Sequence, residues 1–133
     1  MRSRRDRLLL ADRGSAVVEF ALVLPLLLLV VLAVVQVGLL GRDQLLVSQS
    51  SRAGAREAAV DPDDRAVRLA AVEAAPGLDP ERLTVEVQRA GAMGQPVSVS
   101  VAYRATISVP LAGWLFPSEV GLRATATMRQ EFP

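Results

Sequence analysis

A long stretch without charge constrains this chain more than any other feature. No Asp, Glu, Lys or Arg lies between Glu19 and Arg42. An α-helix rises about 1.5 Å per residue, so the roughly 22 residues of this stretch reach about 33 Å, enough to cross a hydrocarbon core of about 30 Å. We therefore expect residues 15–41 to form a transmembrane helix, with the remaining residues on either side of a membrane.

The flanks of the span predict its orientation. A basic leader, residues 1–14, precedes the span, whereas the far flank begins with the balanced pair Arg42 and Asp43. The arginines of the leader are Arg2, Arg4, Arg5, Arg7 and Arg13. By the positive-inside rule, the leader stays in the cytoplasm and the chain after the span is translocated across the cytoplasmic (inner) membrane.

A secretory signal peptide is the simpler interpretation of such a start. Signal peptides have an apolar region of about 7 to 15 residues, followed by a small-x-small cleavage site. The apolar stretch here is longer, and residues 33–38 offer no good site. The sequence therefore favours a span that stays in the protein.

Residues 42–60 are expected to extend the span as a juxtamembrane helix. They contain no proline and many alanines. Leu46, Gln49, Ala53 and Arg56 recur in this segment at helical spacing. We expect this helix to continue into water or the lipid headgroups.

We expect the remaining residues, 61–133, to form a small external domain. It begins with a helix over residues 63–75. Asp61 is the expected N-cap, Pro62 the first helical residue and the Pro-Gly pair at 76–77 the end. One face of this helix carries an apolar stripe of Val67, Ala70, Ala71 and Ala74.

Strict period-two alternation follows over residues 82–89, 97–109 and 120–129, with a hairpin loop at 90–95. One-sided alternation predicts an antiparallel sheet whose apolar face is covered by the preceding helix or helices. The predicted fold class is α+β. A long N-terminal transmembrane helix continues into a juxtamembrane helix and then into one helix packed on a three-stranded antiparallel β-meander.

The composition excludes several classes of function. The chain has no Cys and no His, which removes a thiol nucleophile, an imidazole base and a conventional zinc site. Its net charge of +1 gives no general attraction to nucleic acid. Asp61, Asp63 and Asp64 are better explained as helix-capping residues than as a catalytic cluster. We expect no enzymatic activity, no cofactor and no metal.

Two further features leave alternatives open. Pro25 lies inside the span, where it is either a harmless kink or a functional one. Residues 110–117 form an apolar loop. Its side chains Trp114, Leu115 and Phe116 either plug the end of a small core or contact the membrane or a partner.

Glu19 lies just inside the apolar boundary of the span. A lone carboxylate in lipid is costly, so an intramembrane acid indicates a functional residue. The alternative is an interfacial residue that the positive end of the helix stabilises. Its context, GSAVVEF from Gly14 to Phe20, resembles the class III leader of type IV pilin-like proteins, in which a membrane-embedded prepilin peptidase cuts after the glycine.

More of the chain resembles the TadE-like family, accessory pilin-like proteins of the tight-adherence (Flp) pilus system. The similar stretches are GSAVVEFALVLPLLLLVV at the span, SRAGAREAA after it and ATATMRQE near the end. The resemblance implies cleavage between Gly14 and Ser15, with Glu19 and Phe20 taking part in subunit assembly. It implies prepilin peptidase, other pilin-like subunits and pilus-assembly membrane components as partners, and the lipid bilayer as surroundings.

Two functions follow from these observations. The first is a minor pilin-like protein, or pseudopilin, of Flp pilus assembly or a related secretion machine, because major Flp pilins are much shorter than this chain. The second is a generic single-pass anchored binding or regulatory module that is never cut after Gly14.

Overall fold

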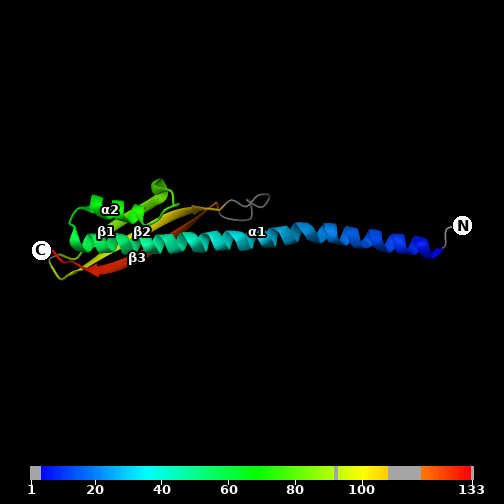
Figure 1. The fold of residues 1–133 in the computed structure, drawn as a ribbon, viewed down its shortest axis with the longest axis horizontal. Helices are drawn as coiled ribbons and strands as arrows, with labels where there is room; N and C mark the ends of the chain where they lie inside the picture. The colour runs from blue at the N-terminus through cyan, green and yellow to red at the C-terminus, as the bar shows by residue number, and fades with distance from the viewer. Residues whose placement is uncertain (1–3, 92, 108–117, 133) are drawn as a thin grey trace. The chain divides into compact units, whose positions relative to one another are not determined.

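The computed structural model describes residues 4–91, 93–107 and 118–132 (Figure 1). The chain divides into two compact units, Met1–Gln36 and Val37–Pro133. In chain order the elements are α1 (Arg4–Val60), α2 (Asp64–Glu73), the 3-10 turn η1 (Pro80–Arg82), β1 (Leu83–Arg89), β2 (Pro96–Thr106) and β3 (Glu119–Arg129). The long apolar helix, the second helix and the three-stranded antiparallel sheet confirm the predicted fold class.

Helix α1 continues without a break from the apolar stretch to Val60. The predicted continuation of the span as a helix is therefore correct. Gln49 and Arg56, which recur at helical spacing with Leu46 and Ala53, are exposed to solvent. The buried face of this segment lies one position further along and carries small side chains. Its buried residues are Val47, Ser50, Ser51, Gly54, Ala55, Ala58 and Ala59.

The N-cap of the second helix, α2, lies two residues later than the sequence suggested. Asp63 is its N-cap, and the Asp63 carboxylate accepts a hydrogen bond from the backbone N–H of Arg65 at 2.9 Å. Asp61, the expected cap, instead accepts from the backbone N–H of Asp63 at 2.7 Å. The backbone N–H of Asp61 still donates to Glu57 of α1, so Asp61 belongs to the end of the first helix.

The three strands form a meander in the order β1-β2-β3, with both pairs antiparallel. The alternation predicted from sequence is correct for β2, whose alternate residues are buried. These are Val97, Val99, Val101, Tyr103 and Ala105. The β2 strand ends at Thr106, short of the expected residue 109, and residues 108 and 109 lie outside the described part of the chain.

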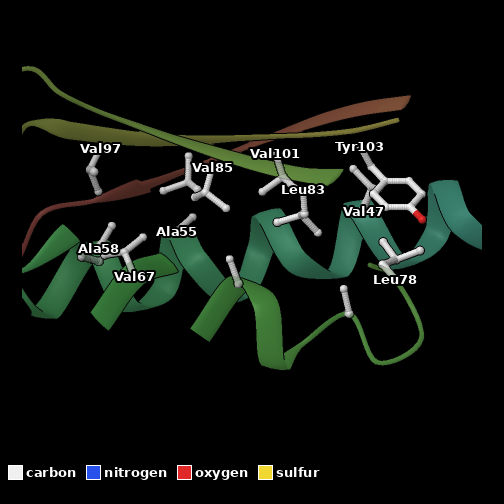
Figure 2. Packing of buried hydrophobic residues seen from close by; sticks show 14 of the residues in the cluster. Val47, Ala55, Ala58, Val67, Leu78, Leu83, Val85, Val97, Val101 and Tyr103 are labelled. Carbon is white, nitrogen blue, oxygen red and sulfur yellow. The ribbon is translucent and has the colours of Figure 1, made fainter. Parts of the chain in front are cut away.

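Helices α1 and α2 both cover the apolar face of the sheet. Figure 2 shows side chains from α1, α2 and the strands pointing into one shared interior, with Val47 near Tyr103 and Ala58 near Val67. Within this core, Val47, Val67 and Val101 have no exposed surface. The last part of α1 is thus a structural element of the unit that contains the sheet.

Small residues allow α1 to pack closely. A Cβ atom on Gly54 would lie 3.1 Å from Val99 Cγ1 and 3.4 Å from the Cβ of Ala71, so the helix backbone itself fills this contact. The Ser50 hydroxyl donates a buried hydrogen bond to the carbonyl of Ala71 at 2.6 Å. Carbonyls near the end of a helix lack a partner within it, so this hydroxyl caps α2 from a neighbouring helix.

Candidate processing and assembly site

The residues of the pilin-like motif lie on the first part of α1. Gly14 and Ser15 are both inside the helix, so the bond between them is helical. The Ser15 hydroxyl donates to Oε1 of Glu19 at 3.2 Å, one helical turn away. The structure therefore brings together two of the predicted site residues through a local contact that the four-residue spacing produces.

The side chains around this pair project away from the protein. The most apolar 18-residue window of the candidate span, Ser15–Val60, has a mean hydropathy of 3.0, and none of it is buried inside the protein. Val17, Phe20 and Leu22 are each more than 60% exposed. So large an apolar surface requires lipid or other apolar helices around it. The helix is long and apolar enough to cross a membrane, and it indicates a membrane anchor.

The arrangement places one carboxylate on the edge of an apolar helix. Glu19 is exposed, and its contact with Ser15 supplies one hydrogen bond. A carboxylate can accept several hydrogen bonds, so it keeps capacity for a cation from the same helix or from a neighbouring one. Chemically, the site suits the binding of an ammonium group.

The other predicted residues lie apart from this pair. Pro25 is inside α1, where it cannot donate a hydrogen bond to the preceding turn, and the helix continues past it. A kink at Pro25 stays a prediction. Trp114, Leu115 and Phe116 lie outside the described residues.

The described residues contain no group of three or more acidic, Cys or His side chains that could hold a metal ion. A shallow depression of about 480 Å³ lies at one end of the β2–β3 pair. It is lined by Gly94, Pro96, Thr127, Met128 and Arg129. Arg129 is the one charged residue in this lining, which provides no acid and base together.

A contact that the sequence does not predict ties α1 to the sheet. The side-chain amide of Gln44 donates to the backbone carbonyl of Arg123 in β3 at 3.0 Å. At the other end, the backbone N–H of Glu131 donates to the carbonyl of Ala59 at 2.8 Å. No local pattern in the sequence predicts either contact, because the partners are far apart in the chain.

The fold and the exposed apolar helix define a class: a protein with one candidate membrane-spanning helix that continues into a small α+β unit. The family model described as "TadE-like protein" matches residues 14–56. This match confirms the resemblance that the motifs indicate. No curated protein and no solved structure matches the chain.

The matched region begins at the glycine of the motif and ends within the last turns of α1. It therefore contains both the Ser15–Glu19 pair and the closely packed Gly54.

Proposed function

We propose that this protein is a minor pilin-like component, a pseudopilin, of Flp (Tad) pilus assembly or a related secretion machine. Prepilin peptidase cuts it between Gly14 and Ser15. One observation carries the proposal: the family match begins at Gly14, on an exposed apolar helix where Ser15 and Glu19 are already in contact. With this geometry, a new amino terminus at Ser15 would lie within one helical turn of the Glu19 carboxylate.

Cleavage would change the charge at this site. It would leave an ammonium group on Ser15, beside a carboxylate that accepts a hydrogen bond from the Ser15 hydroxyl in the uncut helix. In lipid, an ammonium and a carboxylate stabilise each other far more than in water. If neighbouring helices are staggered, Glu19 of one subunit pairs with the amine of another, and this pairing selects pilin-like partners.

The proposed location is the cytoplasmic (inner) membrane, with the leader in the cytoplasm and the α+β unit outside. The five arginines before the span support this orientation. The partners are then prepilin peptidase on the cytoplasmic side, other pilin-like subunits and pilus-assembly components within the bilayer.

Loss of the Glu19 carboxylate is expected to weaken assembly without preventing membrane insertion. Glu19→Ala removes the charge partner while making the helix more apolar. Co-purification of the other pilus components with the variant should fall by about tenfold, the effect of losing roughly 1.4 kcal/mol per contact. The amount of protein in the membrane should stay the same.

Val18→Ala is the matched control, because Val18 is 60% exposed on the same turn and carries no charge. This control should co-purify as the parent does. If Glu19→Ala also co-purifies normally, then Glu19 is only an interfacial residue and has no part in assembly.

The orientation has its own test, since the chain lacks cysteine. Single cysteines at Ser3 and at the exposed Ser118 are introduced in turn. An impermeant thiol reagent added to spheroplasts should label the cysteine at position 118 alone. Labelling at position 3 alone would reverse the topology and contradict the proposed function.

A further inference from the structure

The two outer strands of the sheet each have a free edge. The Arg123 carbonyl accepts from Gln44 of α1, so the odd-numbered residues of β3 direct their backbone groups away from β2. Likewise, the N–H of Leu83 donates to Pro80, which places the odd-numbered residues of β1 on its outer edge. Val85 and Val87 on one edge, and Thr125 and Thr127 on the other, therefore have N–H and C=O groups that point out of the sheet.

Part of each edge has outward groups without a backbone partner, although Gln44 of α1 reaches the β3 edge at Arg123. Across the described part of the chain, no backbone partner is found for the outward groups of Val85, Val87, Thr125 or Thr127. The register of β3 is unbroken over its full length, and β3 contains no proline and no lysine. Long, regular edges of this kind are templates for pairing with another strand.

The last part of α1 distinguishes two ways in which copies can pair through these edges. Gln44 contacts Arg123 and Ala59 contacts Glu131, so this part of α1 runs in the same direction as β3. A two-fold pairing of β3 with β3 would set these α1 segments of two copies antiparallel.

Pairing of β3 with β1 keeps these α1 segments parallel. Both strands are antiparallel to β2, so β1 and β3 run in the same direction. If the β1 edge of one copy lies beside the β3 edge of the next, the strands are parallel and all α1 segments point the same way. Such a contact is heterologous and leaves a free edge for a further copy.

We propose that this protein associates with itself side by side, with the β1 edge of one copy pairing in parallel with the β3 edge of its neighbour. The proposal does not depend on cleavage after Gly14. Copies placed level with one another align Val85 with Ala124. The N–H of Val85 then becomes the second donor to the Arg123 carbonyl, beside Gln44, and the C=O of Val85 accepts from Thr125.

The side chains fit this register. On the helix-covered face it pairs apolar residues with apolar residues, Leu83 with Leu122, Val85 with Ala124 and Val87 with Ala126. In a single copy these β3 residues are only half-buried, whereas Leu83 and Val85 are buried. On the open face, Glu86 lies beside Thr125 and diagonal to Arg123, which places opposite charges together.

Disulfide formation between copies tests the pairing. Glu86 and Thr125 both pair with Ser100, from opposite sides of β2, so within one copy they are two strand spacings apart, about 10 Å. A disulfide needs Cα atoms about 4.4 to 6.8 Å apart. Cysteines at both positions can therefore join only different copies. The full-length double variant, E86C with T125C, is oxidised mildly in membranes and separated on a non-reducing gel.

The double variant should give a ladder of two, three and more linked chains. E86C alone and T125C alone should give none, and E86C with R129C, about 13 Å out of register, should give little. Adding Thr127→Pro should abolish the ladder, because the Thr127 N–H faces the free edge and its loss spares the pairing with β2.

Resistance to trypsin in the membrane shows that each variant is folded. A ladder that persists in folded Thr127→Pro would overturn the proposal. So would dimers formed by T125C alone, which indicate a two-fold contact. A folded double variant that stays monomeric would overturn it as well.

Discussion

Val101→Asp is expected to unfold the α+β unit. Val101 has no exposed surface and lies in the middle strand, between Val85 and Ala124. A carboxylate at this position would have no cation or hydrogen-bond donor, and burying an unpaired charge costs several kcal/mol. Since small domains are stable by only about 5 to 15 kcal/mol, this one change removes most or all of the folding free energy.

Ser98→Asp is the matched control. It lies in the same strand on the open face, where its cross-strand neighbours are the uncharged Gln88 and Thr127. Replacing Ser98 removes the hydrogen bond between the Ser98 and Thr127 hydroxyls, which contributes about 1 kcal/mol to stability. Ser100 would be a poorer control, because it pairs with Glu86 and an aspartate there would face a like charge.

Trypsin digestion of the membrane-inserted protein measures the difference. Cleavage after Arg104, within β2, requires the strand to open. Val101→Asp should be cut there rapidly, whereas Ser98→Asp should resist nearly as well as the parent. Equal resistance of the two variants would show that β2 is not half-buried in this sheet.

Gly14→Val is expected to abolish processing by prepilin peptidase. A protease binds its substrate in an extended form, and the bond after Gly14 is helical in this structure. Glycine disfavours a helix by about 1 kcal/mol relative to alanine and lets another backbone approach closely, so it eases both opening and binding. Valine adds a branched side chain beside the cut.

Gly38→Val is the control for this change. A Cβ at Gly38 would have no atom within 4 Å, so valine there meets open space while altering the same helix in the same way. The amount of shortened chain on a gel should fall to background in Gly14→Val and stay at the parental level in Gly38→Val. Normal shortening of Gly14→Val would place the cut elsewhere.

The fold could be predicted largely from periodicity. The uncharged run identified the apolar part of α1, and the alternation of Val97, Val99 and Val101 with serines identified β2 and its buried face. These signals are strong because each residue type repeats over many positions. Strand ends were less predictable, and β2 stops at Thr106 although apolar alternation continues to residue 109.

The sequence left open whether α1 packs on the sheet together with α2, because the buried face of α1 carries small side chains. Ser50, Gly54 and Ala55 are weakly hydrophobic or polar, so they produce little contrast with Gln49 and Arg56 on the exposed face. Their spacing of three and four residues was the available signal. The N-cap was misplaced for a related reason, since Asp61 and Asp63 both suit a cap and the end of α1 decides between them.

The residues of the candidate site could be recognised from their sequence motif, whereas the contacts around them were less predictable. The spacing of Ser15 and Glu19 gives one helical turn, which the hydrogen bond between them bears out. The contact of Gln44 with Arg123, by contrast, depends on how the sheet packs beside α1. Long-range contacts of that kind have no signature in local sequence.

The intact mass of the protein tests the central proposal most directly. Protein is extracted from membranes of two otherwise identical strains, one with the cognate prepilin peptidase and one without it. We expect a chain beginning at Ser15 in the first strain and a chain that keeps the arginine leader in the second. A leader that stays attached in both strains would contradict processing, and the protein would then be an uncut membrane-anchored module.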